Sequence, residues 1–134
     1  MLVRQVVDPK LAQFAYLVGC PATGEAMVID PQRDVDRYFD EAARLGLRLV
    51  AAADTHIHAD YLSGSRELAS RTGAALLLSA EGGRDWQYAF AERDGAQLGY
   101  LLERARLKLG RLAVDLRDRI LHDGAVGIDF RQGE

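Results

Sequence analysis

Hydrophobic and polar positions in the first third of the chain predict a β-hairpin. Residues 13–19 and 26–30 are rich in branched and aromatic side chains, which favours two strands. Between them, Pro21 and Gly24 supply residues suited to a turn. Pro31 ends the second strand, because proline cannot donate a hydrogen bond to a neighbouring strand.

The pattern then changes to a helical period. Apolar side chains recur every three to four positions over residues 35–45, which is typical of one buried helix face, and Asp34 is predicted to cap this helix. Short apolar runs at 47–53 and 74–79 predict buried strands, with a helix at 61–72 between them. This order of strands and helices predicts an α/β fold with crossover connections.

A second helical period begins near the end of this region. Residues 97–121 place leucines on one face and mostly arginine and glutamate on the other, which predicts a long C-terminal amphipathic helix. We therefore divide the chain into an α/β unit over 1–95, a helical segment over 96–122 and a tail over 123–134.

Composition and charge narrow the classes of function. The net charge of −3 lacks the basic excess of a nucleic-acid-binding protein. No apolar run approaches the roughly 20 residues of a membrane span, and residues 1–13 do not resemble a secretory signal. The single cysteine, Cys20, excludes an internal disulfide. These features predict a cytoplasmic, single-domain protein that binds neither nucleic acid nor a membrane.

Three side chains of the kinds that bind metals follow the strand at 47–53. His56, His58 and Asp60 stand at alternate positions and would point to the same side of an extended segment. Imidazole and carboxylate are the donors that zinc, iron and similar ions select, and α/β sheets bind ligands beyond the carboxyl ends of their strands. The spacing therefore predicts a metal site, and helix capping is the alternative role for Asp60.

Residues 55–60, Thr-His-Ile-His-Ala-Asp, resemble the H-x-H-x-D-H signature of the metallo-β-lactamase superfamily. The longer string over 55–69 is most similar to persulfide dioxygenases and their rhodanese-associated bacterial relatives. Further segments similar to the same group are 14–25, 29–34 and 79–82. The resemblance covers roughly residues 10–95, and it implies the N-terminal half of an αββα sandwich.

The resemblance also implies a chemistry. Persulfide dioxygenases use one Fe(II), held by two histidines and one aspartate, to oxidise glutathione persulfide or a similar small thiol-derived substrate with O2. His56 matches the first iron ligand, whereas His58 and Asp60 match positions beside the metal that orient ligands or bound water. The hydrolytic relative glyoxalase II binds two metal ions, with zinc as the alternative ion.

Tyr61 stands where the superfamily signature has its next histidine. A phenol, whose pKa is about 10, is a poorer ligand at neutral pH than an imidazole. This substitution favours one iron over two zinc ions, and Asp60 and Tyr61 are the candidate catalytic residues.

The later metal ligands of the family have no match in this sequence. The remaining histidine, His122, is predicted to lie at the end of the long helix, where a cation suits the helix dipole. Two alternatives therefore stand beside the dioxygenase: a catalytically incomplete remnant or interaction module, and a glyoxalase II-like thioester hydrolase. The helix is expected either to cover its own sheet or to pair with a second copy in a homodimer.

A few other residues carry two interpretations each. Trp86, Tyr88 and Phe90 alternate, which favours a strand facing the core over a platform for substrate. Arg66 is expected on a solvated helix face, with the carboxylate of glutathione as the alternative partner. Gly64 fits close helix packing or the close approach of a thiol.

Overall fold

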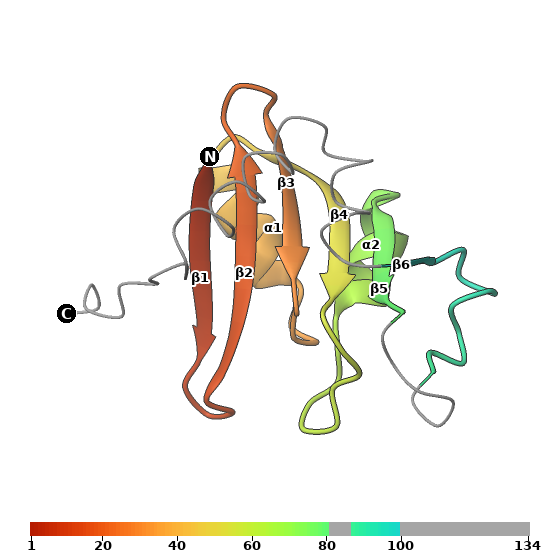
Figure 1. Ribbon diagram of the computed structural model, residues 1–134. Helices are drawn as coiled ribbons and strands as arrows, with labels where there is room; N and C mark the ends of the chain where they lie inside the picture. Colours follow the sequence, from red (N-terminus) through yellow and green to blue (C-terminus); the bar gives the residue numbers. More distant parts are fainter. Residues whose placement is uncertain (81–86, 100–134) are drawn as a thin grey trace, which may run out of the picture.

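The computed structural model describes residues 1–80 and 87–99. These residues form a six-stranded sheet whose strands lie in chain order (Figure 1). The elements are β1 (Leu2–Asp8), β2 (Gln13–Cys20), β3 (Glu25–Ile29), α1 (Asp36–Arg44), β4 (Arg48–Asp54), α2 (Ser65–Thr72), β5 (Ala75–Ser79) and β6 (Gln97–Gly99). Strands β1 to β3 pair antiparallel and β3 to β6 pair parallel. The carboxyl ends of the parallel strands therefore meet at one edge of the sheet.

The predicted hairpin is confirmed as β2 and β3, with Gly24 in the left-handed region at the turn. Strand β1, which pairs with β2 over its whole length, was not predicted from the sequence. Strand β1 is an edge strand in which exposed Val3 and Val7 interrupt the alternation of apolar and polar positions. Its sequence therefore lacks the period on which a strand prediction depends.

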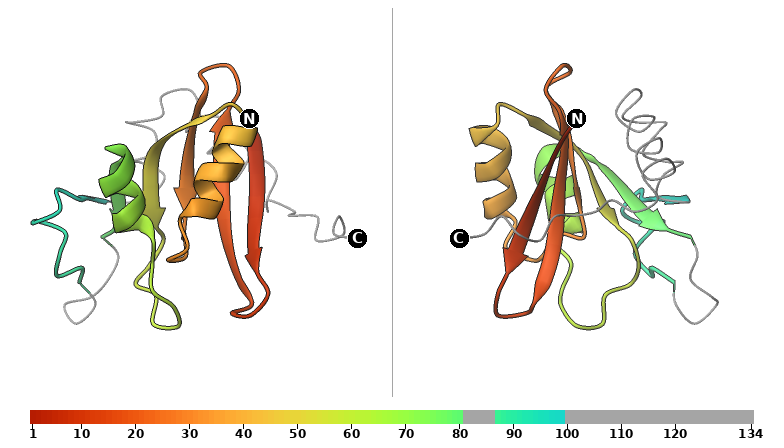
Figure 2. Two further views of the ribbon diagram at one scale, coloured as in Figure 1. Left: turned by 180° about the vertical axis from the view of Figure 1, so that it is seen from behind. Right: turned by 60° about the vertical axis from the view of Figure 1, so that its left-hand side comes forward.

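Both helices cover the same face of the sheet (Figure 2). Helix α1 buries the face that its period predicted, with Val35, Tyr38 and Ala42 at most 3% exposed. Asp34 does not cap the helix, since Val35 occupies the N-cap position and no side chain bonds there. Helix α2 begins at Ser65 and not at residue 61.

Apolar side chains form a cluster on each face of the sheet. The cluster on the helix side contains Ala15, Leu17, Ala26, Val28, Val35, Tyr38, Ala42, Leu47, Leu49, Ala52 and Leu68. The cluster on the other face contains Val18, Met27, Ala51, Ala53 and Leu77. The sheet is therefore apolar on both sides, as expected for the central layer of an α/β fold.

Two predictions for the later part of the chain are wrong where the structure describes it. Residues 87–96 form turns and irregular structure, so Tyr88 and Phe90 do not belong to a strand. Gln97–Gly99 forms β6 beside β5, where the long helix was predicted to begin. The rest of that helix, the tail and His122 lie outside the described residues. None of the helices in the described ranges is long and apolar enough to cross a bilayer.

Candidate metal centre

The histidines lie in a loop, residues 55–64, that connects the end of β4 to the start of α2 (Figure 1). The end of this loop is attached to β4 through Asp54, whose carboxylate accepts hydrogen bonds from the hydroxyls of Ser63 at 2.8 Å and Ser65 at 2.6 Å. Asp54 is 2% exposed, and this burial raises the pKa of its carboxyl above the usual value. The loop is thus closed at its base by a buried carboxylate.

The same loop is also attached to the segment after β3. Gly64 donates its N–H to the carbonyl oxygen of Pro31 at 2.8 Å, and Gln32 and Ser63 form an isolated antiparallel bridge. A Cβ on Gly64 would lie 2.2 Å from the carbonyl oxygen of Gln32 and 2.7 Å from Cγ1 of Val35. The sequence left open whether Gly64 serves packing or a substrate, and the structure shows that glycine is needed here for the close approach of two backbones.

Asp30, at the end of β3, connects the two sides of the site. Its φ is 52°, an uncommon value for a residue other than glycine, and its side chain is 13% exposed. Oδ1 accepts the N–H of Thr55 at 2.7 Å and lies 3.1 Å from Nε2 of His58, while Oδ2 accepts the hydroxyl of Thr55 at 2.7 Å. Burial would raise the pKa of Asp30, but these hydrogen bonds outweigh it and hold the pKa below its usual value.

These contacts set the tautomer of His56. Thr55 has a single hydroxyl proton, which it donates to Asp30. The Thr55 oxygen lies 2.8 Å from Nδ1 of His56, and it can therefore only accept a hydrogen bond from that nitrogen. In neutral His56 the proton is on Nδ1, which leaves the lone pair of Nε2 free to bind a metal ion.

His58 is oriented through its Nε2, whereas His56 is oriented through its Nδ1. Because Asp30 is ionised, Nε2 of His58 donates to it. Nδ1 of His58 is buried and has no hydrogen-bond partner within the described residues. A buried polar atom without a partner carries an energetic cost, and a metal ion at Nδ1 would remove it.

Asp30, His56 and His58 each offer a ligand atom, and these atoms lie within 4.8 Å of one another. The set of two imidazoles and a carboxylate fits a divalent transition metal. Asp30 already accepts three hydrogen bonds out of about four lone-pair sites. We therefore interpret Asp30 as the carboxylate that orients His58 and Thr55, with Nε2 of His56 and Nδ1 of His58 as the ligand atoms.

Asp60 and Tyr61 take different places from the two histidines. Asp60 is exposed and lies outside this group of ligand atoms, and it cannot cap α2, which starts five residues later. Its assignment as a metal ligand or catalytic residue stays a prediction. Tyr61 packs its ring on that of His58, with centroids 4.3 Å apart, and donates its hydroxyl to the carbonyl oxygen of Asp30 at 3.1 Å. Burial raises the pKa of Tyr61 above its usual value, so the phenol stays protonated at neutral pH.

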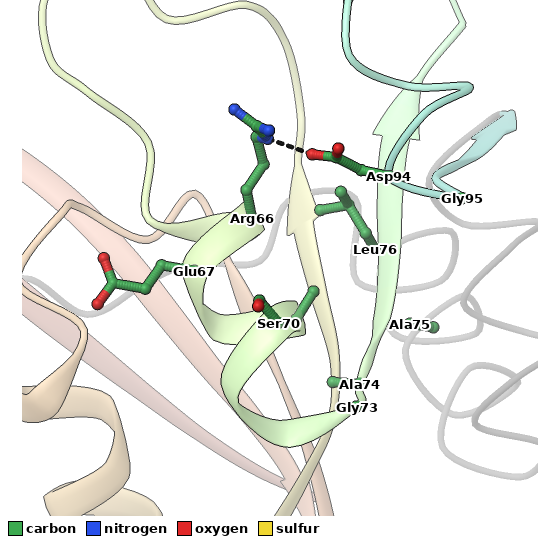
Figure 3. Close-up of a pocket in the computed structure, with 10 residues that line it drawn as sticks. Arg66, Glu67, Ser70, Gly73, Ala74, Ala75, Leu76, Asp94 and Gly95 are labelled. Atoms are coloured by element: carbon green, nitrogen blue, oxygen red, sulfur yellow. Dashed lines mark hydrogen bonds and ion pairs between the residues drawn. The ribbon is translucent and has the colours of Figure 1, made fainter.

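A groove of about 580 Å³ lies elsewhere along α2, and neither the histidines nor Asp30 line it (Figure 3). It is lined by α2, β5 and the turn at Asp94 and Gly95, and Arg66 forms an ion pair with Asp94 across it. The guanidinium of Arg66 also lies 4.3 Å over the ring of Phe90. Arg66 thus holds the turn region against α2, from the exposed helix position that the sequence predicted.

From the sequence, Asp30 was expected only to end a strand and was not connected with the histidines. A signal was present, since Asp30 and Asp54 both stand at the carboxyl ends of predicted buried strands. These ends meet because β3 and β4 are parallel neighbours in the sheet. The roles of Thr55, Ser63 and Ser65 carried no such signal, because they depend on the folded path of the loop.

Comparison with known proteins agrees with the fold and the motif. The model of the metallo-beta-lactamase superfamily matches residues 8–133. Persulfide dioxygenase ETHE1, mitochondrial, of Bos taurus is 35% identical over 101 residues, which cover 74% of this chain and 40% of that protein. A hydroxyacylglutathione hydrolase of Nitrosococcus oceani is 39% identical over 78 residues, which cover 58% of this chain and 29% of the hydrolase.

A solved structure supports the same relationship. The crystal structure of a metallo-beta-lactamase from Staphylococcus aureus superposes with a TM-score of 0.63 and 44% sequence identity. The superposition covers 66% of this chain and 26% of the other. The matched regions therefore cover 26–40% of the length of these three proteins.

Proposed function

The chain belongs to the metallo-β-lactamase superfamily, and we propose that it binds one divalent metal ion, Fe(II), as part of a persulfide dioxygenase site. The observation that carries this proposal is the buried Nδ1 of His58, which has no partner in the described part of the chain. The ring of His56 lies beside it, with centroids 4.3 Å apart. His56 and His58 would hold the ion, so that His58 is here a ligand and not the orienting residue that the resemblance implied. Asp30 and Thr55 would fix the orientation of both rings.

Iron at this site would supply the activation of O2 with which persulfide dioxygenases oxidise glutathione persulfide to sulfite and glutathione. The chain's own residues prepare the site for it. The carboxylate of Asp30 holds a proton on Nε2 of His58, and the Thr55 oxygen holds one on Nδ1 of His56. A third ligand would come from outside the described residues or from another chain.

Tyr61 distinguishes this proposal from a two-metal hydrolase. Because a hydroxyacylglutathione hydrolase is among the relatives, thioester cleavage with zinc remains the alternative function for this chain. In this chain the protonated phenol of Tyr61 is bound to a backbone carbonyl and is not free to bind a second ion. The buried phenol therefore favours one metal ion per chain.

Anaerobic loading with Fe(II) followed by metal analysis tests the proposal. We expect about one equivalent of iron per chain in the wild type and a loss of most of it in His58→Gln, with Thr23→Val as a matched surface control. Less than about half an equivalent in the wild type would count against the metal site. Two equivalents of zinc together with thioester cleavage would favour the hydrolase.

Activity separates the dioxygenase from the catalytically incomplete remnant. Oxygen uptake with glutathione persulfide is expected from the iron-loaded chain only if its ligand set is complete. Turnover by the 134-residue chain would rule out the remnant, and stoichiometric iron without oxygen uptake would support it.

A further inference from the structure

The hydroxyl of Tyr88, like Nδ1 of His58 and Nε2 of Gln32, is a buried polar atom without a partner in the part of the chain that the structure describes. Proteins seldom leave such a group unbonded, because it loses its hydrogen bonds to water and gains none in exchange. Removal of the hydroxyl would cost the fold no hydrogen bond within the described residues. Its presence therefore requires an explanation.

The ring of Tyr88 is held in place by a series of contacts. It meets Phe90 edge to face, with centroids 5.7 Å apart, and it packs on the apolar cluster of Leu76, Leu78 and Ala91. Phe90 is covered by the guanidinium of Arg66 at 4.3 Å. Because these contacts fix the ring, its hydroxyl cannot simply turn toward solvent.

The location of Tyr88 relates it to the metal centre. Leu78, in the cluster that holds the ring, is the partner of Asp54 across β4 and β5. Asp54 immediately precedes the loop that carries the histidines. Burial raises the pKa of Tyr88, and the nearby carboxylates of Asp54 and Asp30 raise it further. The hydroxyl is therefore protonated at neutral pH and can donate a hydrogen bond.

We propose that Tyr88 is a further binding residue of the metal centre, which donates a hydrogen bond to a small anionic ligand held beside the metal ion. This inference rests on the proposed function. The carboxylates of Asp54 and Asp30 repel an anion, so a bound cation is needed before the anion can bind. Anion binding at Tyr88 is thus coupled to metal binding.

The test uses the full chain loaded with Co(II) and titrated with azide as the anion probe. We expect Tyr88→Phe to weaken azide binding by about 10-fold or more, because a hydrogen bond to a charged group is lost. Binding of Co(II) itself should stay within about twofold of the wild type. Metal-free wild type should not bind azide.

Stability of the metal-free chain gives a second readout. Tyr88→Phe should not lower the midpoint of thermal unfolding, because its hydroxyl bonds to nothing in the described protein. Tyr38→Phe is the matched control: the Tyr38 hydroxyl accepts the N–H of Gln32 at 2.9 Å, and its loss should lower the midpoint by about 4 °C or more.

Equal azide affinity in the wild type and Tyr88→Phe would overturn the proposal, as would a loss of stability as large as that of Tyr38→Phe. Failure of the wild type to bind Co(II) would instead refute the proposed function. The anion site would then fall with it, because the anion needs the bound cation, whereas a lowered midpoint in Tyr88→Phe would assign the hydroxyl to the fold.

Discussion

The hydroxyl of Thr55 both donates and accepts a hydrogen bond in the site. The hydroxyl donates to Oδ2 of Asp30 and accepts from Nδ1 of His56. Asp30 in turn accepts from Nε2 of His58. A threonine outside the proposed ligand set thus fixes the tautomer of one histidine and shares its partner, Asp30, with the other.

Thr55→Val keeps the shape of this side chain and removes its hydroxyl. We expect metal affinity to fall by about 10- to 100-fold, because His56 loses the acceptor that fixes its proton. Competition with a chelating dye measures the affinity. Thr23→Val, on the exposed turn between β2 and β3, is the control and should leave affinity unchanged. Equal affinities in all three proteins would contradict this role of Thr55.

The Asp30–His58 pair also predicts a pH dependence of stability. Burial lowers the pKa of His58, but the hydrogen bond and charge of Asp30 outweigh it, and the pKa lies above its usual value. A raised pKa in the folded state adds stability that is fully present below the unfolded value of about 6.5 and is lost as the pH rises through the folded pKa.

His58→Gln should therefore destabilise the metal-free chain more at about pH 5.5 than at about pH 8, since Asp30 is ionised at both. Urea unfolding of the wild type and the variant at both pH values measures the difference. A cost that is larger at the higher pH would show that His58 is not paired with Asp30.

At the scale of elements, the site is a loop held between two neighbouring strands. Asp54 fastens the end of the loop to β4 through Ser63 and Ser65, and Gly64 fastens it to Pro31 after β3. The histidines lie between these attachments. Their position is therefore set by the parallel pairing of β3 and β4 and not by the loop itself.

Gly64→Ala tests this attachment. The added Cβ would collide with the carbonyl oxygen of Gln32, so backbone must move. We expect a loss of about 1–3 kcal/mol in the free energy of unfolding, together with weaker metal binding. Chemical denaturation and metal titration measure the two effects.

Gly46→Ala provides the control for Gly64→Ala. Gly46 has a positive φ of 67° but open space around its Cβ position. Its substitution should cost about 1–2 kcal/mol through the backbone alone and leave metal affinity unchanged. Wild-type metal affinity in Gly64→Ala would show that the loop does not depend on this close approach.

At the scale of the whole molecule, the chain provides two imidazoles and an orienting carboxylate but spans 40% of the length of its bovine relative. A metal ion that binds the folded chain, and not the unfolded chain, must raise the free energy of unfolding. At a free metal concentration of 100 times the Kd, the gain is about 2.7 kcal/mol.

We expect Co(II) to raise the thermal midpoint of the wild type and to leave that of His58→Gln nearly unchanged. Differential scanning fluorimetry over a metal series measures both. An equal shift in the two proteins would show that the metal binds elsewhere.

Light scattering on the same samples tests the predicted homodimer. A strict monomer would rule out the homodimer.

The sequence by itself determined the α/β order, the hairpin, the buried face of α1 and the position of the histidines, because these follow from local periods and a short motif. Strand β1 was not predicted, because its edge position leaves no clear alternation of apolar and polar residues. The predictions for residues 87–99 were wrong, because the alternation around Tyr88 and Phe90 does not mark a strand and the helical period from residue 97 does not begin with a helix.

Only the tertiary structure decided what surrounds the histidines. Asp30 lies 28 residues before His58 and reaches it only because β3 and β4 are parallel neighbours. The proton positions on both rings, the close approach at Gly64 and the unpartnered hydroxyl of Tyr88 likewise arise from contacts between distant segments. A linear pattern records which donors a chain owns, whereas their partners depend on how the chain folds back on itself.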